Sequence, residues 1–297
     1  MDKFFSRFSS FSIIFAAVLW GIIGLFVRTL SAYGLNSLEI MMVRCFFSAG
    51  MIFAYLGSFD RKSLKVRPRD LWMFFGTGIV SFLIFGCAYF AAINLTSMSV
   101  AAVLLYTSPV FVMLMAAVFF KEKITRLKIL SITICVVGCV LVTGGFGGAE
   151  VSAKGIFYGL VSGFCYALYS IFGRIAAKNY NAVTVTAYTF LFAAGGSFFA
   201  ADLPKTAGII IANPALILLC ALFALVSAVL PYIFYTGGLK YTPAGKAAVM
   251  ACVEPVVASM TGVVIFRESM SVQAFCGAVL ILGAIALQNL HFESQKS

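Results

Sequence analysis

The sequence predicts an all-α polytopic membrane protein with ten transmembrane helices, arranged as two inverted five-helix repeats. Composition is the first of three observations that predict this fold class: 62% of the 297 residues are hydrophobic and only 10% are charged, against roughly 25% charged residues in soluble domains. The second observation is a series of apolar runs, and the third is an internal repeat. Each run has about 20 residues, which as a helix crosses a hydrocarbon core of about 30 Å.

The apolar runs recur from one end of the chain to the other. The longest stretch outside them before the C-terminal tail has about eleven residues, Asp60 to Asp70, so no soluble catalytic or nucleotide-binding domain is expected. The first run follows Lys3 and Arg7 as a secretory signal would, but its length and its counterpart at 157–177 favour a transmembrane helix. The ten predicted helices cover about residues 11–32, 38–59, 71–94, 100–120, 127–145, 154–177, 182–201, 213–237, 246–266 and 271–290.

The net charge of +11 is distributed as the positive-inside rule requires. With the N-terminus in the cytoplasm, 16 lysines and arginines lie on the cytoplasmic side and one, Arg44, lies within a helix. The outer side receives only Arg28, Lys154, Lys205 and Arg267. This bias predicts that both termini are cytoplasmic, and it explains the basic charge without nucleic acid as a partner.

No pattern in the sequence indicates a cofactor, a metal site or an enzyme. The single histidine, His291, leaves no histidine-based metal site or catalytic triad inside the membrane. The stretch "PAGKAA" around Lys246 lacks the spacing and the hydroxyl of a phosphate-binding loop. The cysteines all fall in apolar runs without CxxC or zinc-ligand spacing, and small buried fillers are expected at Cys45, Cys87, Cys135, Cys139, Cys165, Cys220, Cys252 and Cys276.

An internal repeat appears when the sequence is compared with itself at an offset of 146 residues. Between Ala101–Glu122 and Ala247–Glu268, eight of 22 positions are identical. The same offset pairs Pro109 with Pro255, Glu122 with Glu268, Arg28 with Arg174, Tyr89 with Tyr235, Phe120 with Phe266, and Trp20 with Tyr166.

The repeat divides the chain into residues 1–149 and 150–297, with five helices in each half. Because five is odd, the second half enters the membrane from the opposite side. Two half-structures of opposite orientation can exchange conformations and expose a midplane site first to one side and then to the other. The repeat therefore favours a secondary transporter.

Four sequence features together resemble the EamA-type branch of the drug/metabolite transporter superfamily. They are "LWG" at Leu19–Gly21, an arginine within the second helix, "TSPVF…FFKE" at the end of the fourth and "EPVVAS…FRE" at the end of the ninth. The resemblance covers about residues 11–290. It implies a central cavity lined by helices 1 to 4 and 6 to 9, with helices 5 and 10 peripheral. It also implies export of amino acids or other small metabolites across the plasma membrane of a bacterial cell.

Glu254 is the first candidate for a functional residue. A charged residue at the centre of a transmembrane helix costs about 2.5–3.5 kcal/mol on insertion scales unless it faces protein or water, so Glu254 is expected to line a cavity. Pro255 removes the helical donor of the Ala251 carbonyl, and Pro109 does the same for Leu105. Such freed backbone groups are tolerated where they meet a cavity or a protein partner, although a simple packing kink also explains a proline.

Two roles are predicted for Glu254. As a fixed anion it would attract a substrate ammonium group, helped by cation–π contact with Trp20, Tyr89, Tyr106 and Tyr235. As a titrating group it would exchange a proton for substrate. Arg44 lies about seven residues into its helix, where a substrate carboxylate, Glu254 or snorkelling to the interface would accommodate its charge.

Other features of the sequence have structural explanations. "NSLE" from Asn36 resembles a capping box that uses Glu39. Glu122 and Glu268 sit beside Lys121 and Arg267 and are expected to hold helix ends in register. A row of small residues, Gly155, Gly159, Gly163 and Ala167, is expected to pack against another helix of the same chain, with a homodimer contact as the alternative.

The leading functional hypothesis is a secondary active transporter that exports amino acids or similar small metabolites, with the proton as the candidate coupling ion and the lipid bilayer around it. Uptake of an organic cation such as a quaternary amine is the alternative within transport. A channel is a second alternative. An intramembrane enzyme or redox protein is disfavoured, because the sequence offers neither a nucleophile with its base nor a quinone-linked cysteine pair.

Overall fold

The computed structural model describes residues 2–145 and 152–294, and each of the ten predicted runs is helical in it. The described residues contain no strand, so the prediction of an all-α polytopic membrane protein is confirmed. Seven helical spans, single or broken, are long and apolar enough to cross a membrane. The other three predicted runs form α9, α11 and α17.

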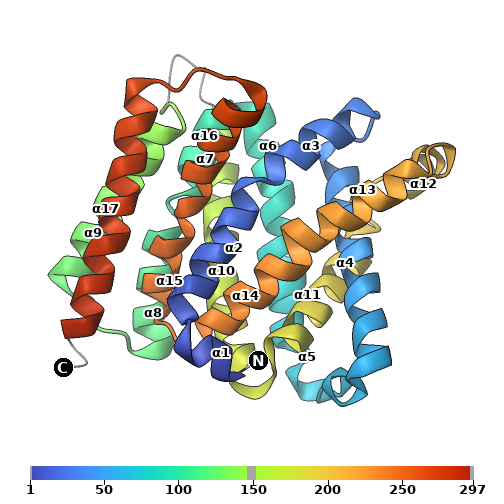
Figure 1. Cartoon of the computed structure of the whole chain (residues 1–297), viewed down its shortest axis with the longest axis horizontal. Coiled ribbons are helices and arrows are strands. Elements are labelled where there is room, and N and C mark those ends of the chain that lie inside the picture. The colour runs from blue at the N-terminus through green and yellow to red at the C-terminus, as the bar shows by residue number, and fades with distance from the viewer. Residues whose placement is uncertain (1, 146–151, 295–297) are drawn as a thin grey trace.

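The helices follow the order of the two repeats (Figure 1). The first repeat contains α1 (Asp2–Arg7), α2 (Ser9–Gly21), α3 (Ile23–Ala32), α4 (Ser37–Phe59), α5 (Leu71–Phe75), the π-helix η3 (Gly76–Ile84), α6 (Phe85–Leu95), α7 (Met98–Leu105), α8 (Ser108–Phe120) and α9 (Arg126–Val142). The second contains α10 (Ala153–Asn179), α11 (Ala182–Ser197), α12 (Leu203–Ala212), α13 (Ala215–Ala224), the π-helix η4 (Leu225–Val229), α14 (Leu230–Leu239), α15 (Ala244–Ala251), α16 (Val253–Phe266) and α17 (Val272–Ser294).

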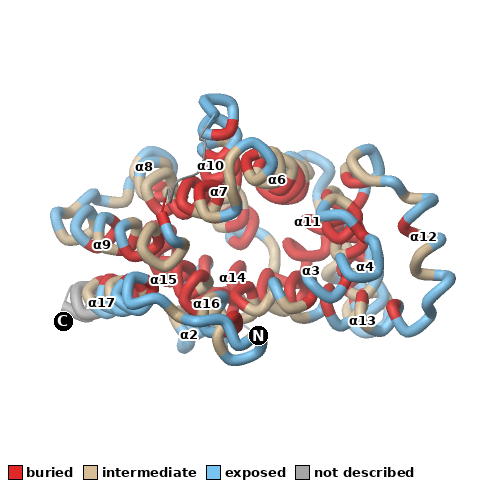
Figure 2. The backbone as a smooth tube through the Cα atoms, turned by 90° about the horizontal axis from the view of Figure 1, so that it is seen from above, coloured by how far each residue is buried: buried red, intermediate tan, exposed pale blue. Residues whose placement is uncertain are grey.

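The two ends of the chain lie at the same end of the helix bundle, where α1 begins and α17 finishes (Figure 1). This is the arrangement that an even number of crossings produces. The bundle surface is apolar: Val118, Leu218 and Val264 are between 73% and 76% exposed. Exposed residues gather on the outer sides of α9, α12 and α17, and buried residues face inward (Figure 2). A lipid bilayer, rather than water, suits such a surface.

The two repeats pack by exchanging partners. The first helix of the first repeat, α2, lies against α14, α15 and α16 of the second repeat. Its counterpart α10 lies against α6, α7 and α8 of the first repeat. The equivalent helices α4 and α11 contact each other, as do α9 and α17, which form one edge of the bundle (Figure 2). Each repeat therefore completes the core of the other.

Two ion pairs join the repeats at equivalent positions. Arg28 pairs with Glu268 at 2.7 Å, and its counterpart Arg174 pairs with Glu122. The guanidinium groups also lie over Phe266 and Phe120, at 4.1 and 4.6 Å from the ring centroids. The expected structural role of both glutamates is consistent with these contacts, in which each arginine comes from the opposite repeat and not from the adjacent position.

The helix ends beside these glutamates have the same backbone geometry in both repeats. Lys121 and Arg267 adopt left-handed conformations, with φ of 55° and 56°. The next N–H donates to the carbonyl six residues earlier, from Glu122 to Ala116 and from Glu268 to Gly262. Such a C-terminal turn satisfies carbonyl groups that the ended helix leaves free.

Helix α12 was not predicted from the sequence. Asp202 caps it by accepting from the Lys205 N–H, and Pro204 lies in its first turn. The helix places Lys205 Nζ at 2.8 and 3.0 Å from the two carboxylate oxygens of Glu39. The predicted capping box of Asn36 and Glu39 is present, so the buried Glu39 carboxylate has both a backbone donor and a cation.

The two equivalent ion pairs, Arg28–Glu268 and Arg174–Glu122, differ in burial. The Glu122 side chain is 11% exposed and also accepts from Lys128 and the Ala244 N–H, whereas Glu268 is 50% exposed. Burial raises the pKa of Glu122, but the Ala244 N–H, Lys128 and Arg174 outweigh it and hold this pKa below its ordinary value. Because the folded-state pKa lies below the unfolded one, the stabilisation is present at neutral pH and is lost as the pH falls through the folded value.

We predict that Glu122→Gln lowers the thermal stability of the purified protein more than Glu268→Gln does. Breaking a buried pair costs about 3–5 kcal/mol, and partial exposure reduces that figure here, whereas an exposed pair contributes about 0.2–1 kcal/mol. Thermal unfolding in detergent measures both variants, and the gap should close under acidic conditions. Equal losses of Tm at neutral pH would contradict the prediction.

Candidate functional site

Glu254 lies in the first turn of α16, directly after the interruption of the helix at Cys252, between α15 and α16. Its Oε2 accepts a hydrogen bond of 3.1 Å from the Tyr166 hydroxyl of α10. A carboxylate in a first helical turn is also stabilised by the helix dipole. The residue as a whole is of intermediate exposure, and that its carboxyl group lines a cavity stays a prediction.

The predicted proline kinks are complete breaks. α7 ends at Leu105 and α8 starts at Ser108, while α15 ends at Ala251 and α16 starts at Val253. Pro109 and Pro255 thus lie in the first turn of a new helix, where N–H groups have no intrahelical acceptor in any case. The breaks occupy equivalent places in the two repeats. That the prolines line a cavity stays a prediction.

The equivalent residues Trp20 and Tyr166 contact each other, with ring centroids 6.5 Å apart. Residues related by a two-fold axis can touch only close to that axis. In an inverted repeat the axis lies in the membrane plane. The contact therefore places Tyr166, and the Glu254 carboxylate bonded to it, near the middle of the bilayer.

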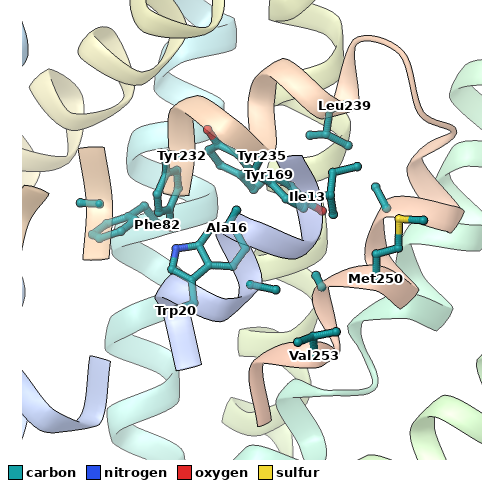
Figure 3. Close-up of a cluster of buried hydrophobic side chains, with 14 of the residues drawn as sticks. Ile13, Ala16, Trp20, Phe82, Tyr169, Tyr232, Tyr235, Leu239, Met250 and Val253 are labelled. Atoms are coloured by element: carbon teal, nitrogen blue, oxygen red, sulfur yellow. The ribbon is translucent and has the colours of Figure 1, made fainter. Parts of the chain in front are cut away.

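An aromatic cluster surrounds this point (Figure 3). The indole of Trp20 lies 5.3 Å from the Tyr232 ring and 5.2 Å from the Tyr235 ring. Tyr169 lies 4.9 Å from Tyr232. The Tyr235 and Ser170 hydroxyl groups are 2.8 Å apart. The rings come from α2, α10 and α14, so both repeats build the cluster.

Arg44 points into the bundle from α4. Its Nη2 donates to the Ser227 carbonyl in the π-helix η4, and its guanidinium lies 5.1 Å from the Phe82 ring centroid. A π-helix has irregular backbone hydrogen bonding, which makes a carbonyl available to a side chain at this depth. Among the described residues Arg44 and Glu254 form no direct ion pair, so the two charges are held separately.

Two buried donors in this region have no hydrogen-bond acceptor, Trp20 Nε1 and Arg44 Nε. Both side chains contact Tyr232, Trp20 as described and Arg44 at 5.9 Å from the ring centroid. Unsatisfied buried donors are costly, and an anionic or carbonyl group placed beside Tyr232 would satisfy them. The aromatic cluster is therefore bordered both by unsatisfied donors and by a carboxylate.

The structure brings all six predicted site residues into one region. Glu254 lies within electrostatic range of Arg44, Tyr89, Tyr106 and Tyr235, and Trp20 contacts Tyr235. Tyr89 is one layer removed, since it stacks on Phe85, which contacts Tyr166. Their roles in the substrate pathway remain predictions.

Sequence reasoning missed Tyr166, Tyr232 and Phe82 as members of the site. The signal for Tyr166 was its alignment with Trp20 at the repeat offset. Tyr232 and Phe82 carried no signal of their own, because aromatic residues are abundant in this chain and only packing distinguishes those that meet Arg44.

A small cavity lies between the two helix breaks. It is lined by Tyr106 and Ser108 at one break, Cys252 at the other, and Tyr166, Ser170 and Tyr235 between them. Its volume of about 10 Å³ is the room of a single water molecule. The structure is therefore closed around this point, and a metabolite enters only after the helices move.

Glycines allow the helices to approach this closely. A Cβ on Gly163 of α10 would lie 2.8 Å from the Leu104 carbonyl oxygen beside the first break. The predicted glycine row thus packs within the chain. A Cβ on Gly21 would lie 2.9 Å from the Glu254 carbonyl oxygen and 2.7 Å from Val257 Cγ1. The glycine of "LWG" therefore allows α2 to pack closely against the second break.

These features define a polytopic α-helical membrane protein in which two inverted repeats enclose a midplane carboxylate, the architecture of secondary transporters. The chain belongs to the EamA-like transporter family, which matches residues 7–144 and again residues 153–290. The resemblance drawn from the sequence is confirmed, and the family indicates a membrane transporter rather than an enzyme.

Similar proteins extend over nearly the whole chain. The chain is 27% identical to an uncharacterized transporter of Archaeoglobus fulgidus, over 95% of this chain and 96% of that one. It is 22% identical to the uncharacterized inner membrane transporter YicL of Salmonella typhimurium, over 96% of each chain. A crystal structure with 17% identity matches with a TM-score of 0.74 over 97% of this chain and 99% of that chain, which shows that the fold is shared.

We predict that Gly21→Ala destabilises the protein by about 1–3 kcal/mol, the usual cost of overpacking a well-filled core. Gly24→Ala is the matched control, because a Cβ at Gly24 would meet nothing within 4 Å and alanine is the better helix former. Unfolding of both variants in detergent measures the difference. A Gly21→Ala protein as stable as Gly24→Ala would show that the contact between α2 and α16 is looser than described.

Proposed function

We propose that this protein is a secondary active transporter that exports amino acids or closely similar zwitterionic metabolites by alternating access. The observation that carries the proposal is the separation of two charges around one aromatic cluster. Glu254 bonds to Tyr166, and Arg44 and Trp20 with its unsatisfied N–H both contact Tyr232. A small zwitterion carries an ammonium group for the carboxylate and a carboxylate for the donors.

Each substrate group has a physical reason to bind where we place it. The ammonium group would meet the Glu254 carboxylate among ring faces of Trp20, Tyr166 and Tyr235, which attract cations. The carboxylate would accept from Arg44 Nε and Trp20 Nε1, which otherwise have no acceptor. Charged hydrogen bonds of this kind contribute about 1.5–3 kcal/mol each. Apolar parts of the substrate would contact Phe82 and Tyr232.

The proton is the proposed coupling ion, and Glu254 is its proposed carrier. When no ammonium group is present, protonation would make Glu254 neutral, and a neutral carboxyl group suits the apolar surroundings of the closed bundle. Binding of the ammonium group would release that proton, so one site holds proton or substrate in turn. This exchange allows a proton gradient to drive export without a nucleotide. The proposal places the protein in the plasma membrane with both termini in the cytoplasm.

We predict that Glu254→Gln abolishes coupled transport while leaving membrane insertion intact. Reconstituted vesicles loaded with labelled amino acid and given a pH gradient should show initial rates at least about tenfold lower, as expected for loss of one charged hydrogen bond. Asp2→Asn makes the same carboxylate-to-amide change at a side chain that is 64% exposed and pairs with Lys240, and it should keep most of the rate. Wild-type rates for Glu254→Gln would overturn both proposed roles of this carboxyl group.

We predict that Arg44→Gln affects the binding of amino acids and of amines differently. It should weaken binding of an amino acid by about 10- to 100-fold but leave binding of the corresponding decarboxylated amine nearly unchanged, because the amine has no carboxylate. Glu254→Gln should weaken both. Thermal-shift titration of the purified variants measures these affinities through ligand stabilisation. Tighter binding of quaternary amines than of amino acids by the wild-type protein would instead favour an organic-cation transporter.

A further inference from the structure

Three cysteines that are distant in sequence meet beside the second helix break. Cys135 and Cys139 lie one turn apart on the inward face of α9, and Cys252 lies in the break between α15 and α16. Their three Sγ atoms all lie within 4.8 Å of one another. The side chains are fully or almost fully buried, at 0%, 0% and 2% exposure. Sequence spacing gave no sign of this trio, because one of its members comes from the other repeat.

The other cysteines do not behave in this way. Cys45, Cys165 and Cys220 are buried singly, as the expected small fillers, whereas Cys87 is partly exposed and Cys276 is exposed, so the filler expectation is wrong for these two. No other group of three histidine, cysteine or acidic side chains in the described part of the chain offers its ligand atoms to one point in this way.

The repeat shows that packing alone does not require these thiols. At the offset of 146 residues, the counterparts of Cys135, Cys139 and Cys252 are Ile281, Ile285 and Tyr106. The same corner of the fold is therefore filled without sulfur in the other half, and both isoleucines are buried there. The three thiols are a chemical difference between two otherwise equivalent places.

We propose that Cys135, Cys139 and Cys252 form a three-thiolate binding site for a trivalent thiophilic metalloid of the arsenite class. Bonds of about 2.3 Å from a pyramidal central atom to sulfur place three sulfurs roughly 3.5 Å apart, so the trio, within 4.8 Å of one another, needs only a small inward shift. Thiolates are soft ligands that select soft acceptors. The closest polar group described at Cys252 Sγ is the Ala248 carbonyl, 3.5 Å away, so no fourth side-chain ligand completes a tetrahedral zinc site.

Charge selects a trivalent acceptor. Arsenous acid and three thiols condense to an arsenic trithiolate and three water molecules: three As–O bonds break, three As–S bonds form, and each thiol proton leaves on a hydroxide. Arsenic stays in the +3 state and the adduct is neutral. Three thiolates around a divalent ion would carry one net negative charge, which an apolar surrounding disfavours. Neutral arsenous acid also enters a buried site without a charge penalty.

The site adjoins the small closed cavity at the centre of the protein, so a metalloid reaches it only when the helices move. Cys252 lines the small cavity between the helix breaks, beside Tyr106, Tyr166 and Tyr235. A metalloid bound there ties α9 to the break from which α16 starts, two residues before Glu254. This binding does not depend on the proposed substrate or coupling ion, so it is tested on the purified protein without a transport assay.

Native mass spectrometry of the full chain in detergent tests the proposal with arsenite as the probe. A variant that retains only the trio, with Cys45, Cys87, Cys165, Cys220 and Cys276 replaced by alanine, should gain one arsenic and lose three hydrogens. Cys139→Ala in that background should lose the three-hydrogen adduct and bind arsenite at least about tenfold more weakly, a loss seen even for outer ligands of metal sites. An adduct unchanged by Cys139→Ala, or no adduct on the trio-only protein, would overturn the site.

Two further arms keep the test decisive. Cys139→Val in the wild-type background covers the case in which the multiple variant does not fold, and it should also lose the three-hydrogen adduct. Zinc at the same concentration should leave arsenite bound, because zinc lacks a fourth ligand here and would leave a buried charge. Displacement of arsenite by zinc would overturn the choice of a neutral trivalent ligand.

Discussion

The structure depends on how an apolar bundle accommodates one carboxylate near the middle of the bilayer. Glu254 is held by the Tyr166 hydroxyl and by the start of α16. Neither is available in the middle of an unbroken helix facing lipid. The break between α15 and α16 supplies the free N–H groups of a helix start, and the cavity between the two breaks supplies polar neighbours. The helix break thus explains how the charge is tolerated, and the charge gives a reason for the helix break.

The two repeats share a scaffold but not a chemistry. Helix breaks, left-handed C-terminal turns and inter-repeat ion pairs occur in both halves at the same offset. Such shared geometry is what lets two halves exchange conformations across a membrane. At the breaks, however, Ser108 stands opposite Glu254, and Tyr106 stands opposite Cys252. Symmetry would allow such a motion, while the two charged residues proposed to meet a substrate, Glu254 and Arg44, have no charged counterpart in the other repeat.

The sequence predicted those parts of the structure that depend on local or repeated patterns. Ten apolar runs predicted the helices, "NSLE" predicted the capping box, and the offset of 146 residues predicted equivalent helix ends. It did not predict contacts that depend on how the repeats exchange partners. Arg28 reaches Glu268 and Arg174 reaches Glu122 because α2 and α10 pack on the opposite repeat. The same exchange of partners brings Tyr232 to Arg44 and Cys252 to α9. Local periodicity carries no information about such pairings, and abundant phenylalanine and tyrosine conceal the few rings that matter.

Helix α16 connects the two features that a transport cycle has to couple. It starts beside Cys252 with Glu254 in its first turn and ends at Phe266, two residues before Glu268 and its ion pair with Arg28. Its 14 residues form a rod of about 21 Å at 1.5 Å per residue. A ligand shifts a conformational equilibrium only by its difference in affinity for the two states. Neutralising the charge of Glu254 can therefore affect distant parts of the protein only if it changes the position of a rigid element. A tilt of α16 about the break at Cys252 changes the separation of Glu268 from Arg28, while α8, which starts at its own break, ends beside the ion pair of Glu122. In the proposed transport cycle the carboxylate, the break and the end contacts of α16 would therefore move together, whereas α8 in the other repeat has the break and the end contacts without the carboxylate.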